Sequence, residues 1–267
     1  MPIDYLHNHP EFNDLIRAVE HQRNIDSSLV EKDYWIMHCL YGLQKEKFQF
    51  KLKGGTSLSK GFQIIHRFSE DIDVRIGPPD DMDVKTGKNQ TKPAHCESRK
   101  KYYDWLAGKI RIDGISKVAR DTKFDNETYF SGGVRLYYES AFPGLEGIKE
   151  GILLEVGFDD VTPNEPVDIS SRALDFAQDK GLKVKDNRAC GVRCYHPGYT
   201  LVEKLQTIVT KFRRQQEEGH IPANFIRHYY DVSCLLKNDT AQKFIGTPDY
   251  ITHKKKRWVC DIKEGFK

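Results

Sequence analysis

The sequence predicts an α+β fold in which a mixed sheet is flanked by helices and followed by a helical C-terminal part. Four strands are predicted in the first two-thirds of the chain. Residues 48–52 and 72–76 alternate apolar and polar residues, as half-buried strands do, and two further strands are expected at residues 133–140 and 151–158. After Pro197 the apolar residues recur at helical spacing instead. We therefore expect a mixed α/β domain over residues 1–195 and a helical C-terminal domain over residues 196–267.

Helices are expected around these strands. Residues 27–43 carry an apolar face before the first strand, and residues 57–66 repeat that spacing between the first two strands. A basic helix is predicted over residues 97–112. We interpret its aromatic residues, and the pair Tyr229–Tyr230, as core packing rather than as platforms for nucleic acid bases; in the basic helix these are Tyr102, Tyr103 and Trp105.

The charge distribution suits a polyanionic partner. The 267 residues have a formal charge of only +3, but residues 85–123 hold 11 Lys/Arg against 4 Asp/Glu. This segment and the run at residues 253–258 fit either a nucleic acid backbone or a solvated surface. No run of 18 apolar residues occurs, and the first residues lack a signal-peptide pattern, so we expect a cytoplasmic protein without a membrane span.

The six cysteines are sparse and irregular, which favours reduced thiols over disulfides. Cys190, Cys194 and His196 lie close together in the sequence and suggest zinc, with His95 and Cys96 as further ligands. Because no second pair stands at ligand spacing, we favour the interpretation without zinc.

The stretch "KGGTSLSKGFQIIHRFSEDIDVRI", residues 53–76, contains the main candidate site. The pair Gly54–Gly55 after a strand lets backbone N–H groups approach an anion, and the N-terminus of a following helix favours negative charge. Hydroxyls and one ammonium group follow, at Thr56, Ser57, Ser59 and Lys60. The spacing is not that of a Walker A loop, so this part of the pattern is weak evidence by itself.

Asp71 and Asp73 are the stronger signal. Residues two apart on a strand point to the same face, so both carboxylates should project together. Their mutual repulsion would be relieved by a divalent cation such as Mg²⁺. The alternative is a solvated pair that forms salt bridges with Arg67 or Arg75.

Together, a strand, Gly-Gly-Thr, a helix and Asp-Ile-Asp resemble the DNA polymerase β-like nucleotidyltransferase superfamily. The fuller string resembles its AbiEii/AbiGii-type branch, which includes the MenT-like toxins of type IV toxin–antitoxin systems. Three further segments resemble that family in the expected order: "EKDYW" at residues 31–35, "HPGYTLVEKLQTI" at 196–208 and "FIRHYYDVSCLL" at 225–236. Residues 78–131 match nothing in this pattern, so we expect substrate choice to reside there.

The resemblance implies a role for each matching residue. Asp71 and Asp73 would bind Mg²⁺ or Mn²⁺, with either Glu155 or Asp159 as the third carboxylate. Lys204 would neutralise triphosphate charge, and Asp231 would be catalytic or would orient Lys204. The remaining nucleotide-binding candidates are Gly54, Gly55, Thr56, Ser57, Lys60 and Arg67.

The resemblance therefore implies a metal-dependent nucleotidyltransferase that moves a nucleoside monophosphate from an NTP to an acceptor. RNA, tRNA in particular, is the favoured acceptor, and the protein would be the toxin of a pair with an antitoxin protein. Two alternatives remain open: a transferase acting on a protein or a small molecule, and a non-catalytic nucleotide- or RNA-binding module of the same fold.

Overall fold

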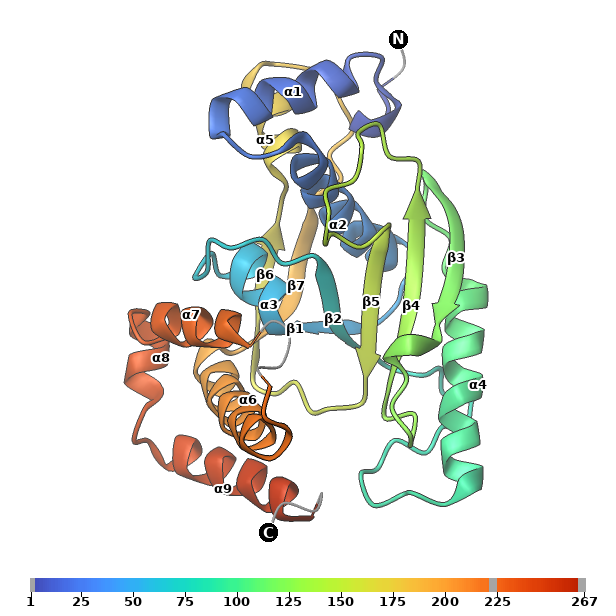
Figure 1. The fold of residues 1–267 in the computed structure, drawn as a ribbon. Helices are drawn as coiled ribbons and strands as arrows, with labels where there is room; N and C mark the ends of the chain where they lie inside the picture. The colour runs from blue at the N-terminus through green and yellow to red at the C-terminus, as the bar shows by residue number, and fades with distance from the viewer. Residues whose placement is uncertain (1–2, 221–224, 264–267) are drawn as a thin grey trace.

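A seven-stranded mixed sheet forms the centre of the protein, as Figure 1 shows for the computed structural model, which describes residues 3–220 and 225–263. The strand order is β3-β4-β5-β2-β1-β7-β6. The strands are β1 (Phe50–Lys53), β2 (Asp71–Ile76), β3 (Ile115–Asp121), β4 (Ser131–Tyr138), β5 (Ile152–Gly157), β6 (Asn164–Ile169) and β7 (Ala189–Tyr195). β2 runs parallel to β5 and antiparallel to β1, whereas β1 and β7 are parallel.

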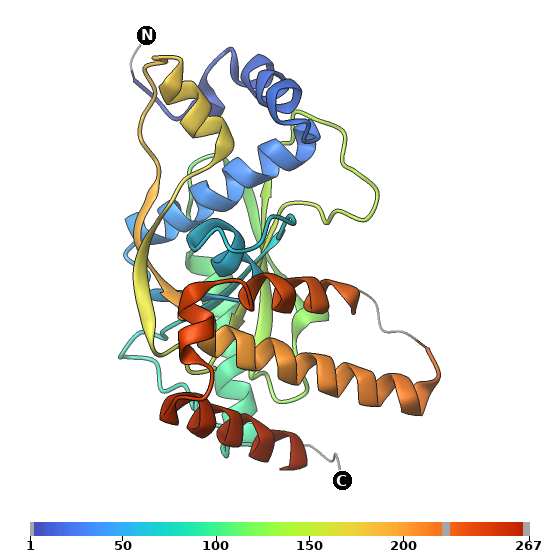
Figure 2. The same cartoon turned by 90° about the vertical axis from the view of Figure 1, so that its left-hand side faces the viewer.

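Helices lie on both sides of the sheet and beyond one end of it (Figures 1 and 2). α2 packs against β5 and β7, and α4 packs against β3 and β4. The last helices form a separate layer in which α7, α8 and α9 contact α6. The helices are α1 (Phe12–Arg23), α2 (Ser27–Lys45), α3 (Gly54–Thr56), α4 (Pro93–Lys109), α5 (Arg172–Asp179), α6 (Pro197–Glu218), α7 (Ile226–Leu235), α8 (Asp239–Phe244) and α9 (Pro248–Lys263).

The predicted α+β class with a mixed sheet is confirmed, and each of the four predicted strands overlaps an observed one. Three strands, β3, β6 and β7, were not predicted. β6 was missed because it contains Pro166, which is tolerated here since β6 is an edge strand. β7 was missed because it contains Gly191 and lies within the stretch that suggested zinc. The division at residue 196 coincides with the change from strands to helices, but independent folding of the two parts stays a prediction.

The helix predicted over residues 57–66 is wrong. The helical segment instead starts at Gly54 and closes with one π-helical turn, Ser57–Gly61. Beyond it, Gln63 takes a positive φ of 54°, which an α-helix does not accommodate. The chain then continues without regular structure to β2, which brings residues 64–70 over the end of the sheet.

The predicted burial of the aromatic residues is confirmed in α4 and wrong in α7. Tyr102 and Tyr103 are fully buried and Trp105 packs against the core, so their interpretation as a buried face is confirmed. Tyr229 and Tyr230 are 46% and 39% exposed, so their assignment to the core is wrong. α7 has buried residues on only one side, and both tyrosines lie off that side. No helix in the described ranges is both long and apolar enough to cross a membrane.

Three consecutive charged residues of α2 are buried and bind three different segments. Glu31 accepts hydrogen bonds from Ser140 Oγ and Ala141 N, which begin the loop between β4 and β5. Lys32 donates to Glu70, just before β2, and to a carbonyl at the end of that loop. Asp33 accepts from the Lys60 ammonium at 2.6 Å and from Arg172 at 2.9 Å. α2 therefore fixes the segments that surround the carboxyl-bearing end of β2.

Candidate functional site

The turn after β1 requires glycine at residue 54. Gly54 has a φ of +69°, and a Cβ atom there would lie 1.9 Å from Asp73 Oδ2. The backbone of the turn therefore lies directly against the Asp73 carboxylate. At Gly55 a Cβ atom would lie 2.5 Å from Ser69 Oγ, so this glycine lets the segment before β2 approach the turn.

The hydroxyl groups of this turn face inward. Thr56 Oγ1 donates to the Asp71 carbonyl and lies 3.2 Å from Ser69 Oγ, and both Thr56 and Ser57 are fully buried. These two predicted nucleotide-binding residues therefore do not present their hydroxyls to an open surface. The structure gives Thr56 a role in holding the turn against β2, whereas the Ser57 hydroxyl is buried without a hydrogen-bond partner among the described residues.

Register places three carboxylates together. Because β2 and β5 are parallel, with Asp73 opposite Glu155 and Asp71 opposite Leu153, the acidic side chains share one face of the sheet. All three line a cavity of about 320 Å³, here called the carboxylate cavity. Its other lining residues are Gly55, Arg67, Phe68, Ser69, Glu70, Gly147, Ile148, Lys204 and Arg227.

Burial and mutual proximity raise the pKa of two carboxylates in the carboxylate cavity. Burial, reinforced by the charges of Asp73 and Asp71, raises the pKa of Glu155 to about 7, against the partial compensation of Lys149. Burial also raises the pKa of Asp71, again opposed by Lys149. Three hard oxygen donors this close together, two of them with raised pKa values, fit a divalent cation such as Mg²⁺ or Mn²⁺.

Lys149 was not among the predicted residues, and no local pattern marks it in the sequence. Its Nζ lies 2.5 Å from Asp71 Oδ2. Among the described residues, no three or more His, Cys, Asp or Glu side chains are arranged so that they could hold a metal ion together.

Asp159, the alternative third carboxylate, is bound elsewhere. Its oxygens lie 3.1 Å from Lys53 Nζ and 3.1 Å from Lys88 Nζ. Burial would raise the pKa of Asp159, but these ammonium groups outweigh it and hold the pKa well below the ordinary range. Asp159 does not line the carboxylate cavity, so Glu155 is the carboxylate that the fold brings to Asp71 and Asp73.

Asp231 holds two of the basic residues that line the cavity, Arg67 and Lys204. Its side chain is fully buried and accepts hydrogen bonds from Arg67 Nε at 2.7 Å and Nη2 at 2.8 Å, with Lys204 Nζ at 2.9 Å. Burial would raise the pKa of Asp231, but the Arg67 hydrogen bonds and the Lys204 charge lower it overall. Asp231 does not line the cavity, so of its two predicted roles the geometry matches the one in which it orients Lys204.

Arg67 and Arg75 do not pair with the two aspartates of β2. Arg67 is engaged by Asp231, and Arg75 donates to the Asp159 carbonyl at 3.3 Å. The alternative of a solvated pair bridged by these arginines is therefore not what the structure contains.

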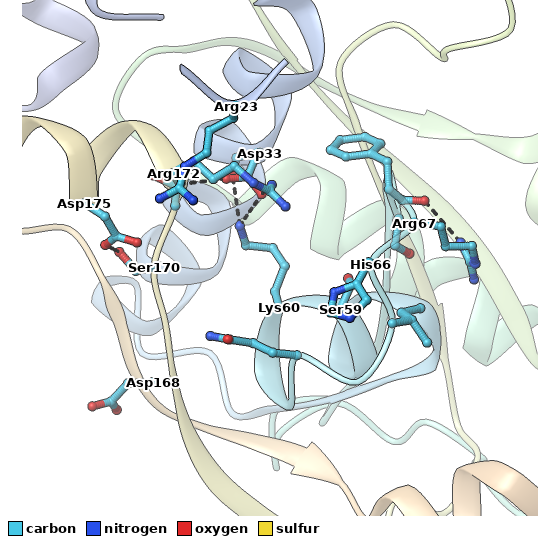
Figure 3. Close-up of a pocket in the computed structure, with 15 residues that line it drawn as sticks. Arg23, Asp33, Ser59, Lys60, His66, Arg67, Asp168, Ser170, Arg172 and Asp175 are labelled. Atoms are coloured by element: carbon cyan, nitrogen blue, oxygen red, sulfur yellow. Dashed lines mark hydrogen bonds and ion pairs between the residues drawn. The ribbon is translucent and has the colours of Figure 1, made fainter. Parts of the chain in front are cut away.

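Lys60 lies apart from the carboxylate cavity. It lines a second cavity of about 340 Å³, where its ammonium points to Asp33 beside Arg172 and Arg23 (Figure 3). The two cavities share the wall formed by residues 67–69. Lys60 thus ties the turn to α2. Because Lys60 does not line the carboxylate cavity, the structure does not place it where it would contact a nucleotide bound there.

The other predicted features also lie outside the cavity. Cys190 is exposed and Cys194 is buried, and neither belongs to a metal-binding group among the described residues. Residues 85–123 do not contribute to the cavity lining as described, and Lys88 of this segment is engaged by Asp159.

The comparisons with known proteins identify the family. Residues 38–250 match the model described as nucleotidyl transferase AbiEii toxin, type IV toxin–antitoxin system. The chain belongs to the AbiEii nucleotidyltransferase toxin family. The resemblance found in the sequence is confirmed, and the match includes the turn, β2, β5, Lys204 and Asp231.

Two solved structures are similar to this AbiEii-family protein. One is MenT4, a nucleotidyltransferase toxin from Mycobacterium tuberculosis, with 16% identity and a TM-score of 0.47 over 73% of this chain and 58% of that one. The other is an antigenic nucleotidyltransferase-like protein from Paracoccidioides brasiliensis, with 10% identity and a TM-score of 0.38 over 84% and 93% of the two chains. The chain thus spans less than two-thirds of MenT4. No curated protein sequence matches it.

Gly54→Ala should destabilise this AbiEii-family protein by about 3 kcal/mol. The left-handed conformation accounts for about 1 kcal/mol of this, and displacement of Asp73 by the new methyl group for the rest. Gly181→Ala is the matched control, because Gly181 has a φ of +72° with no atom near the added Cβ. Urea denaturation of both variants measures the difference; equal losses would contradict the close contact between Gly54 and Asp73.

Glu155→Gln should alter how stability depends on pH. The folded protein keeps a proton on Glu155 up to a pKa of about 7, whereas the unfolded chain loses it near 4.5, so raising the pH across this window destabilises the wild type. Relative to wild type, the free energy of unfolding of Glu155→Gln should rise by about 3 kcal/mol between pH 4.5 and 8. Denaturant titrations across that range test this, and a difference independent of pH would refute the crowding of Glu155 by Asp71 and Asp73.

Proposed function

We propose that the protein is a metal-dependent nucleotidyltransferase that moves a nucleoside monophosphate from an NTP to a hydroxyl group of RNA, with tRNA the favoured acceptor. One observation carries the proposal: a single cavity holds the carboxylates Asp71, Asp73 and Glu155 together with Arg67, Lys204 and Arg227. The acidic set suits a divalent cation, and the basic set suits the phosphates of the substrate that the cation accompanies.

Asp71, Asp73 and Glu155 would hold Mg²⁺ or Mn²⁺. A divalent cation bound there supplies charge neutralisation for the phosphates and makes the acceptor hydroxyl easier to deprotonate. Gly54 packs against Asp73, Gly55 lines the cavity where the triphosphate would lie, and Lys204 and Arg67 pair with the triphosphate from positions that Asp231 fixes. The acceptor oxygen attacks the α-phosphorus, and the bond to the bridging oxygen breaks to release pyrophosphate.

The inward-facing residues keep supporting roles in this proposal. Thr56 holds the turn against β2, Ser57 is buried within it, and Lys60 anchors it to Asp33. In this proposal both sides of the division at residue 196 contribute to the site. The helical part supplies Lys204 and Arg227, and the sheet supplies the carboxylates.

RNA is favoured as acceptor because of the surplus of 7 positive charges in residues 85–123, and the family description supports a toxin with an antitoxin partner. A protein or small-molecule acceptor would use the same carboxylate cavity. A non-catalytic binding module is disfavoured, because the close fit of Gly54 on Asp73 and the three clustered carboxylates are what catalysis would need.

Label transfer tests the function. The protein is incubated with Mg²⁺, each NTP labelled at the α-phosphate, and total cellular RNA. Asp71→Ala should reduce transfer about 100-fold or more, because it removes electrostatic stabilisation that acts on the transition state. Asp159→Asn is the control carboxylate and should keep most of the activity, since Asp159 lies outside the cavity.

Transfer that survives in Asp71→Ala would reject the metal assignment. Loss in Asp159→Asn with retention in Glu155→Gln would reverse the choice of the third carboxylate. If label reached protein but not RNA, the acceptor would be wrong while the transferase proposal stood; if label reached nothing, the transferase proposal would fall. Thermal melts of all variants separate these outcomes from unfolding.

A further inference from the structure

Near its end, the loop between β4 and β5 carries Lys149, which contacts the proposed metal ligand Asp71. Figure 2 shows this loop and the α6–α7 pair extending from the sheet to the same side. Gly147 and Ile148 of the loop line the carboxylate cavity, and Lys149 Nζ lies 2.5 Å from Asp71 Oδ2. An ammonium group therefore engages one carboxylate oxygen that the proposed function gives to a divalent cation.

The backbone of Lys149 is fixed at both of its polar groups. Its N–H donates to Glu70 Oε2 at 3.0 Å, and its carbonyl accepts from Lys32 Nζ. Lys32 is itself buried, with 3% of its side chain exposed, and lies 3.3 Å from Glu70. Since Glu70 directly precedes Asp71, this Lys32–Glu70–Lys149 contact ties the end of the loop to the start of β2.

The side chain of Lys149 is held much less firmly. It is 34% exposed, and its other described contact is with the face of the Phe124 ring, 4.9 Å from the ring centroid. A lysine ammonium is a compact charge on a flexible four-carbon stem, so it can leave Asp71 while the backbone stays in place. It would then remain at the cavity, because its Cα cannot move away.

Two cations cannot share the same carboxylate oxygen without strong repulsion. We propose that Lys149 is an internal counter-cation: it holds Asp71 while no metal is bound, is displaced by the divalent cation, and then pairs with the phosphates of the nucleotide. This inference rests on the proposed function. It makes Lys149 a nucleotide-binding residue whose position depends on whether the metal is present.

The first test measures Mn²⁺ binding to the full chain without nucleotide, by the electron paramagnetic resonance signal of free Mn²⁺. Lys149→Met should bind Mn²⁺ about fivefold more tightly than wild type, the change expected for losing a competing contact worth about 1 kcal/mol. Lys149→Arg keeps the charge and should stay near wild type. Lys123→Met is the matched control, because it removes an exposed lysine next to Phe124.

The second arm measures binding of a non-hydrolysable NTP in saturating Mn²⁺. Here Lys149→Met should bind several-fold more weakly, because the displaced ammonium is missing. Opposite shifts in the two arms are a signature that simple loss of structure would not produce. A Mn²⁺ affinity unchanged or weakened in Lys149→Met, or an unchanged nucleotide affinity, would overturn the inference.

A measurement on the wild-type protein covers the case in which Lys149→Met fails to fold. Reductive methylation of Lys149, read by mass spectrometry, should be faster with Mg²⁺ than without it, while Lys123 serves as the reference; an unchanged rate would overturn the inference. Absence of Mn²⁺ binding in wild type and in every variant would reject the metal site itself, and so separates failure of the proposed function from failure of the role of Lys149.

Discussion

Repulsion among Asp71, Asp73 and Glu155 is the constraint on which the rest of the site depends. The parallel register of β2 and β5 sets Asp73 beside Glu155, and burial strengthens their interaction. Lys149 offsets part of this charge through its contact with Asp71 at 2.5 Å. Burial first, and then the charges of Asp73 and Asp71, raise the pKa of Glu155 despite Lys149, and this crowding of buried carboxylates makes the cavity suited to a divalent cation.

The same cavity carries positive charge that does not cancel the carboxylates. Arg67 and Lys204 are directed to Asp231, which is fully buried and accepts hydrogen bonds from both. A buried carboxylate with two cationic partners is well satisfied, and removing one member would leave an uncompensated charge. Asp231 therefore keeps two cations at fixed positions, so that they do not pair with Asp71 and Asp73.

Helix α2 provides the frame for this balance of charges. Glu31, Lys32 and Asp33 each bind a different segment around the cavity, and their partners lie in the β4–β5 loop, before β2 and in the turn after β1. Buried charges are tolerated only when they are paired, so these contacts also specify which segments must meet. The segment "EKDYW", which entered the argument only as a family resemblance, thereby acquires a physical explanation.

Local periodicity predicted the features that depend on one strand or one helix. The alternation in β2 placed Asp71 and Asp73 on a common face, and the fold class followed from the same pattern. Contacts between distant segments left no such signal: nothing near Lys149 indicates that it reaches Asp71, and nothing near Lys60 indicates that Asp33 draws it into another cavity. The insertion of β7 beside β1 is of the same kind, because parallel pairing brings together residues far apart in the sequence.

The most direct test of the account is a crystal structure of the protein with Mn²⁺ and a non-hydrolysable NTP, with anomalous diffraction recorded for manganese. The account predicts an anomalous peak coordinated by Asp71 and Asp73, with the triphosphate extending toward Lys204 and Arg67. A nucleotide bound elsewhere, or a manganese peak on Asp159 with none at Asp71 and Asp73, would contradict it.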